Sequence, residues 1–114
     1  MIRVYHNNRC SKSRGACDIL KANGIDAEII EYLKTPPAEN EIRDILVKLG
    51  MKASDIVRRG EEIYKNKFAG NKYTESEWIK ILSENPILIE RPIIVNGDKA
   101  VIGRPLEKIN EIFK

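Results

Sequence analysis

The chain has 114 residues, a size that suits one domain able to fold without disulfide bonds or a structural metal. Two cysteines and one histidine are too few for a four-ligand zinc site without carboxylates, so we expect no metal. The net charge is +3, but residues 1–17 hold four cations and no acid, whereas the rest has 16 cations and 17 acids. This small, local excess argues against a nucleic-acid surface and favours a small anion near the N-terminus.

The first predicted elements are a strand, a helix and a second strand. The β-rich run at residues 2–5 predicts the first strand, and residues 27–33 predict the second. Between them, helical spacing is marked by Ala16, Ile19, Leu20 and Asn23. Gly24 is a typical residue for ending that helix. Because all three elements fall within the first 33 residues, we expect a βαβ unit with parallel strands and a right-handed crossover.

The middle of the chain is predicted to be helical. Pro36 and Pro37 suit the start of a helix, and its apolar stripe ends before Gly50 and consists of Ile42, Ile45, Leu46 and Leu49. A short helical piece is expected at residues 54–59, with Ser54 as its cap. Residues 74–77 form a capping-box pattern in front of another amphipathic helix, which Pro86 closes.

The C-terminal part returns to strands. Two β-branched runs, 93–95 and 100–102, flank Asn96-Gly97-Asp98, which predicts a hairpin. A final helix is indicated by the stripe Leu106, Ile109, Ile112 and Phe113. The order βαβ, helical middle, ββα predicts an α/β fold of the thioredoxin-like class. It would have a four-stranded mixed sheet, flanking helices and a helical insertion, all in one domain spanning residues 1–114.

Cys10 is the candidate reactive residue. It lies between the first strand and the first helix, where open α/β sheets bind ligands and where helix N–H groups favour negative charge. The cations Arg9, Lys12 and Arg14 act in the same direction. An ordinary thiol with a pKa near 8.5 is only about 3% thiolate at pH 7, and lowering that pKa by about 2 units makes it mostly thiolate. We therefore expect a nucleophilic thiolate rather than an incidental surface cysteine.

Three neighbouring residues qualify this expectation. Ser13 occupies the position where two-cysteine oxidoreductases carry their second cysteine, so an external thiol would have to resolve any adduct on Cys10. Cys17 is too far along a helix to pair with Cys10 and falls on the apolar face, which favours core packing. His6 could stabilise the sulfur of Cys10, cap the strand or face solvent, and these alternatives stay open.

Four ordered blocks carry a resemblance: "YHNNRCSKSR", "EYLKTPP", "ILIERPIIV" and "GRP". Together they resemble the ArsC family, the glutaredoxin-linked arsenate reductases of thioredoxin-like fold, across essentially the whole chain. The resemblance implies that Cys10 attacks arsenate to form a thiol–arsenate adduct. Glutathione, the reducing co-substrate, and glutaredoxin then discharge arsenite, and no bound cofactor is implied.

The resemblance also assigns the residues around the thiol. It implies that three arginines bind the oxyanion, namely Arg58, Arg91 and Arg104. Arg59 is the neighbouring competitor of Arg58 for this role. His6 matches the family histidine ahead of the cysteine, and Pro92 matches the cis-proline of thioredoxin-like folds. Arginine suits this role because its forked donors and permanent charge match a tetrahedral oxyanion.

Two other functions remain as alternatives. One is an Spx-like transcriptional regulator that binds RNA polymerase, although such proteins usually carry a Cys-x-x-Cys switch and Ser13 breaks that pattern. The other is a glutathione-dependent thiol-disulfide reductase, which needs the thiolate but not three arginines. The sequence shows no signal peptide or transmembrane run, so we expect a cytoplasmic protein that does not bind membranes. Its modest size and the lack of an obvious exposed apolar stripe favour a monomer, its charge distribution argues against nucleic acid, and the family resemblance implies a part in arsenic detoxification.

Overall fold

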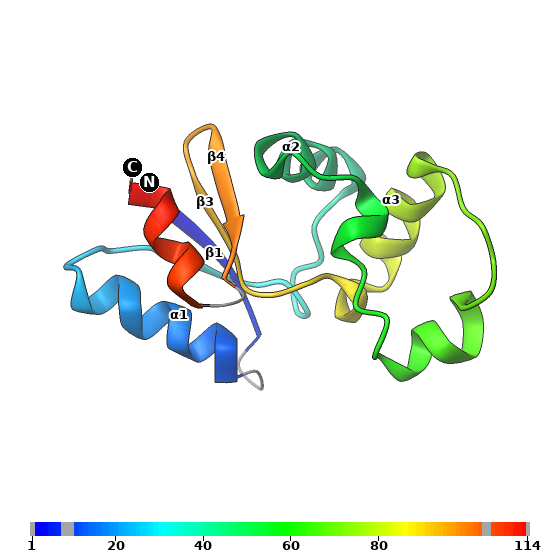
Figure 1. The fold of residues 1–114 in the computed structure, drawn as a ribbon, viewed down its shortest axis with the longest axis horizontal. Helices are drawn as coiled ribbons and strands as arrows, with labels where there is room; N and C mark the ends of the chain where they lie inside the picture. Colours follow the sequence, from blue (N-terminus) through cyan, green and yellow to red (C-terminus); the bar gives the residue numbers. More distant parts are fainter. Residues whose placement is uncertain (1, 8–10, 104–105, 114) are drawn as a thin grey trace. The chain divides into compact units, whose positions relative to one another are not determined.

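The computed structural model describes residues 2–7, 11–103 and 106–113. The chain divides into two compact units. The sheet unit consists of Met1–Thr35 and Arg91–Lys114, and the helical unit is Pro36–Glu90. The helical unit corresponds to the helical middle predicted from the sequence (Figure 1).

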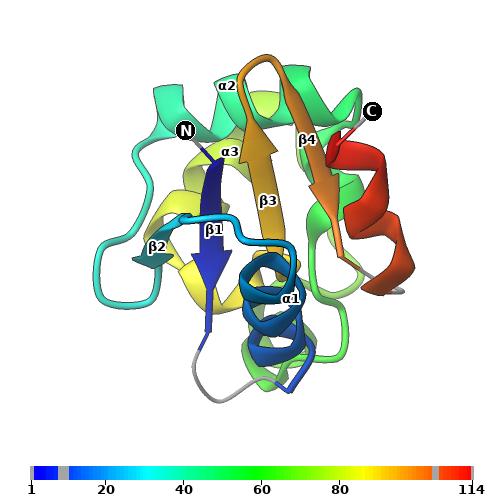
Figure 2. The ribbon, with the colours of Figure 1, turned by 90° about the vertical axis from the view of Figure 1, so that its left-hand side faces the viewer.

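The sheet unit is built on a four-stranded mixed sheet with the order β2-β1-β3-β4 (Figure 2). The strands are β1 (Ile2–His6), β2 (Glu28–Glu31), β3 (Ile93–Asn96) and β4 (Lys99–Ile102). β1 pairs in parallel with β2, and β3 pairs antiparallel with both β1 and β4. The predicted βαβ unit and hairpin are therefore confirmed, and the fold is thioredoxin-like.

Two helices of the sheet unit share a core with the two central strands. They are α1 (Ser11–Ala22) and the C-terminal 3₁₀-helix η4 (Leu106–Phe113). The fully buried cluster contains Val4, Ala16, Leu20, Ile94, Ile109 and Ile112. Burying each large aliphatic side chain contributes about 1.5–3 kcal/mol, so these few contacts fix both helices on the sheet. The apolar spacing predicted for both helices is what this packing requires.

Turn residues end these elements where the sequence predicts. Gly24 has a φ of +71° after α1, and the N–H of Ile25 donates to the carbonyl of Leu20 at 3.0 Å, which closes the helix. Gly97 has a φ of +62° in the two-residue loop between β3 and β4. Asn96 belongs to β3 and pairs with Lys99, so Gly97 and Asp98 alone form the loop.

The helical unit contains two longer helices and three short ones. These are α2 (Glu39–Leu49), η1 (Ala53–Ile56), the π-turn η2 (Tyr64–Phe68), α3 (Glu75–Glu84) and η3 (Pro86–Leu88). Its buried apolar residues include Ile42, Ile45 and Leu46 of α2, and Trp78 and Leu82 of α3. The predicted capping box is present, since the hydroxyl of Thr74 accepts from the N–H of Glu77 at 3.2 Å and the Glu77 carboxylate accepts from the N–H of Thr74 at 2.8 Å.

The short helix predicted at residues 54–59 differs from the structure. The observed helix is Ala53–Ile56, and Val57 is extended, with φ −85° and ψ 127°. The reason is a distant pairing: Val57 forms an antiparallel bridge with Ile89. The N–H of Arg58 donates to the carbonyl of Leu88 at 2.7 Å, and the N–H of Glu90 donates to the carbonyl of Ile56 at 2.8 Å. The residues around Val57 cannot indicate this pairing, because Ile89 is distant in the sequence.

Candidate active site

Cys10 lies outside the described residues, and the structure describes the segments that flank it. β1 ends at His6, and α1 begins at Ser11 with no acid in its first turn. The hydroxyl of Ser13 accepts from the N–H of Asn7 at 3.0 Å, and both residues are buried. Ser13 therefore ties the end of β1 to the first turn of α1. The acid-free helix N-terminus that directly follows Cys10 in the chain favours negative charge.

His6 and Cys17 contact each other inside the sheet unit. His6 is buried, so it does not face solvent, and its Nδ1 lies 3.8 Å from the sulfur of Cys17. Burial, with a further contribution from Asp18 against an opposing one from Lys21, raises the pKa of the Cys17 thiol. Cys17 is a free cysteine, partly buried against the core. A raised pKa leaves it protonated at neutral pH and unsuited to act as the nucleophile.

Arg91 and Pro92 lie where the chain enters β3. The Arg91–Pro92 peptide bond is cis, as the family resemblance implies. Arg91 is 8% exposed, which is unlike the solvated surface arginine that would be the ordinary expectation. The carbonyl of Pro92 accepts from the N–H of Gly103 at 2.9 Å, so the segment after β4 is bonded to the cis-proline. Arg104, the next residue in the chain, lies outside the described residues. Arg14 is exposed on α1.

Arg58 belongs to the helical unit and is engaged by two carboxylates. Its Nη1 donates to Oε1 of Glu90 at 2.9 Å, and its Nε lies 3.9 Å from Oε1 of Glu61. The side chain is 23% exposed. Glu90 and Glu61 were not singled out from the sequence. Glu90 stands directly before Arg91 in the printed chain, but its partner is 32 residues away, so only the fold reveals the pair.

Arg59 makes a different set of contacts. Its Nη1 donates to the hydroxyl of Tyr64 at 2.6 Å, its Nη2 donates to the carbonyl of Ser54 at 3.4 Å, and its guanidinium carbon lies 5.4 Å from the centre of the Tyr64 ring. These contacts fix Arg59 on the helical unit's own surface. The two neighbouring arginines therefore differ in their partners: Arg58 is paired with carboxylates, whereas Arg59 contacts a hydroxyl, a carbonyl and an aromatic ring.

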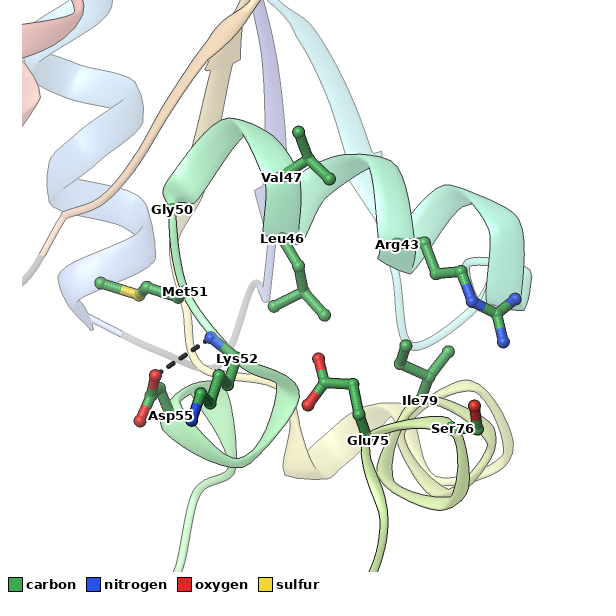
Figure 3. A pocket seen from close by; sticks show the side chains of 10 residues that line it. All are labelled: Arg43, Leu46, Val47, Gly50, Met51, Lys52, Asp55, Glu75, Ser76 and Ile79. Atoms are coloured by element: carbon green, nitrogen blue, oxygen red, sulfur yellow. Dashed lines mark hydrogen bonds between the residues drawn. The ribbon is translucent and has the colours of Figure 1, made fainter.

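The helical unit also has an open hollow of about 580 Å³ between α2, η1 and the start of α3 (Figure 3). Leu46 and Ile79 line it, together with the exposed side chains of Val47 and Met51. Of the predicted site residues that the structure describes, none lines this hollow. Among the residues that the structure describes, no group of three or more His, Cys, Asp or Glu side chains could hold a metal ion.

Comparison with known proteins supports the family that the ordered sequence blocks indicate. Residues 5–112 match the model of the ArsC family. The chain belongs to the ArsC family. As a member of the family, it is 40% identical over 114 residues to an arsenate reductase of Neisseria meningitidis serogroup B, covering 98% of this chain and 97% of that protein. It is also 43% identical over 113 residues to the uncharacterized protein YfgD of Escherichia coli K12, covering 97% and 95%.

The backbone of this ArsC-family chain is also similar to that of a solved structure. The arsenate reductase from Vibrio cholerae superposes with a TM-score of 0.93 at 36% identity, covering 97% of this chain and 96% of that one.

In the described part of the chain, no helix is both long enough and apolar enough to span a membrane. Of the predicted site residues, the sheet unit holds His6, Ser13, Arg14, Arg91 and Pro92, and the helical unit holds Arg58.

Proposed function

We propose that the protein is an arsenate reductase that uses Cys10 as its nucleophile. The observation that carries the proposal is the match, over nearly the full length of both chains, to proteins named arsenate reductase in Neisseria meningitidis and Vibrio cholerae. The acid-free first turn of α1 and the buried Arg91 support it, since both favour an anion. Cys17 suits this role less well, because burial raises the pKa of its thiol.

The proposed reaction transfers two electrons from two thiols to arsenic. The Cys10 thiolate attacks arsenic(V) and displaces one arsenate hydroxyl, which takes up a proton from solvent and leaves as water, and a thiol–arsenate adduct results. Glutathione then supplies the second thiol: the adduct breaks down to arsenite, arsenic is reduced to arsenic(III), and the two sulfurs become a mixed disulfide. Glutaredoxin reduces that disulfide and restores Cys10. Ser13 cannot replace glutathione, because its hydroxyl is buried, bonded to Asn7 and has no redox chemistry.

The arginines supply what a thiolate attacking an anion needs. Two negative charges repel each other, so fixed cations must hold them together, and positioned donors of this kind typically contribute about 10²–10³-fold to the rate. We propose this role for Arg58, Arg91 and Arg104, with His6, Ser13, Arg14 and Pro92 in support. The protein would act without a bound cofactor, as a cytoplasmic monomer that contributes to arsenic detoxification.

Arsenite formation by the purified protein with glutathione and glutaredoxin tests the proposal. We expect turnover in the wild type, none in Cys10→Ser, and retention of most activity in the matched control Cys17→Ser. Arg91→Ala should lower kcat/KM for arsenate by about 10²–10³-fold. A protein that reduces mixed disulfides equally well with and without Arg91, but not arsenate, would instead be a thiol-disulfide reductase.

A further inference from the structure

The guanidinium of Arg58 lies between two acids of the helical unit. Glu90 accepts from Nη1 at 2.9 Å, and Oε1 of Glu61 lies 3.9 Å from Nε. That Nε is buried and donates a hydrogen bond to none of the described residues. Both carboxylates compete with any further anion for the donors of this guanidinium.

The backbone fixes the Arg58–Glu90 pair. Because Val57 is bridged to Ile89 in an antiparallel manner, Arg58 and Glu90 are diagonal neighbours on one face of the paired segments. The side chains are 23% and 28% exposed. The ion pair between Lys34 and Glu31 is more exposed: its atoms lie 3.5 Å apart, and the lysine side chain is 76% exposed. The Arg58–Glu90 pair is thus built into the fold and is more than a solvated surface contact.

Because of the geometry of the guanidinium, Glu90 and a bound oxyanion would compete for the same donors of Arg58. Arginine binds oxyanions through two forked edges, one made by its two Nη nitrogens and one made by Nε and the neighbouring Nη. Glu90 takes Nη1 of the first edge, and Glu61 faces Nε of the second. An oxyanion can therefore pair with the edge made by the two Nη nitrogens in a bidentate manner only after the carboxylate of Glu90 has moved aside.

We propose that Glu90 is a positioning residue that acts through Arg58: it holds the guanidinium in place and gives it up when a tetrahedral oxyanion binds. This inference rests on the proposed role of Arg58 in binding arsenate. Glu90 keeps Arg58 ordered in the absence of substrate, at the expense of affinity for the anion. In the sequence, Glu90 directly precedes Arg91, another of the arginines proposed to bind the oxyanion.

Calorimetric titration with arsenate tests the proposal, using protein that carries Cys10→Ser so that no chemistry follows binding. Glu90→Gln keeps an acceptor for Nη1 and removes the charge, so arsenate should bind about fivefold more tightly. Glu61→Gln should act in the same direction with a smaller effect, and it provides a second measurement if Glu90→Gln folds poorly. Glu84→Gln, an exposed residue on α3, changes the net charge equally and should leave the affinity unchanged.

Arg58→Ala separates this inference from the function on which it rests. We expect it to weaken arsenate binding and to cancel the gain from Glu90→Gln in the double variant. If Arg58→Ala weakens binding but Glu90→Gln leaves it unchanged or weaker, Glu90 does not compete and the inference is wrong. If Arg58→Ala has no effect, the proposed role of Arg58 is wrong. With Cys10 intact, Glu90→Gln should lower KM for arsenate without raising kcat, a split that a purely structural role would not produce.

Discussion

At the scale of single residues, Gly103 shows how closely the chain approaches the cis-proline. Its N–H bonds to the carbonyl of Pro92, and a Cβ at this position would lie 3.0 Å from Cγ of Pro92 and 3.2 Å from Cγ1 of Ile109. Both neighbours are buried, so neither can move freely. A side chain here would push the segment that leads to Arg104 away from Pro92.

We therefore expect Gly103→Ala to reduce the free energy of unfolding by about 1–3 kcal/mol, the usual cost of overpacking a core. Urea denaturation measures this change. Gly60→Ala is the matched control, because a Cβ there meets nothing within 4 Å, and its effect should stay within about 0.5 kcal/mol. Equal effects at the two glycines would show that close approach at Gly103 is not what fixes its identity.

At the scale of elements, the start of α3 depends on the reciprocal bonds of Thr74 and Glu77. The hydrogen bond from the Thr74 N–H, followed by the bond that involves its side chain, lowers the pKa of Glu77 from its ordinary value of 4.5. The folded protein thus holds this carboxylate deprotonated more strongly than the unfolded chain does. The resulting stabilisation is fully present above about pH 4.5 and is lost as the pH falls through the lowered pKa of the folded state.

Three variants test this account of α3. Thr74→Ala should cost about 1 kcal/mol at pH 7, and Thr74→Ser should restore the cap. The stability difference between wild type and Glu77→Gln should be present at pH 7 and shrink toward zero as the pH drops below about 4. Urea unfolding at a series of pH values measures both effects. A difference that stayed constant down to pH 2 would contradict the role of the ionised carboxylate.

At the scale of the whole molecule, the sheet unit and the helical unit are joined by two chain crossings, at residues 35–36 and 90–91. Each unit is about half of a chain of 114 residues, and a piece of that size buries too little surface to be more than marginally stable alone. We therefore expect the two units to unfold together, as single domains of this length usually do.

The sequence supplies one natural probe for each unit. Trp78, the only tryptophan, lies in the helical unit, and His6, the only histidine, lies in the sheet unit. Trp78 fluorescence and the NMR signal of His6 should give the same urea midpoint. Two separate midpoints would show that the units fold independently, and the single domain that the sequence predicts would then be the wrong description.

Elements whose signals are local were predictable. Thr74 with Glu77, Gly24 after α1, and the Gly97 turn act through hydrogen bonds or dihedral angles within a few residues of themselves, and the structure confirms each. The short helix at residues 54–59 was predicted too long, because Val57 pairs with Ile89 across more than 30 residues. Only the folded chain brings that partner into contact.

In the candidate site too, local features could be predicted from the sequence and contacts between distant residues could not. The position of Ser13, the acid-free segment around Cys10 and the motif at Arg91–Pro92 could be read directly from the sequence. The contact between His6 and Cys17 could not, because it joins a strand to a helix 11 residues later. Nor could the capture of Arg58 by Glu90, which depends on the register of two paired segments.

The sequence alone determined the chemistry that this protein can offer: Cys10 in a cation-rich segment, Ser13 where two-cysteine enzymes carry a second cysteine, and arginines in a chain that matches the ArsC family. These are properties of residue type and order along the chain. Only the tertiary structure decided which carboxylates hold Arg58, what lies beside His6, and how closely Gly103 approaches Pro92. Those outcomes depend on side chains from distant segments meeting at ångström distances, and such meetings are set by packing and strand register.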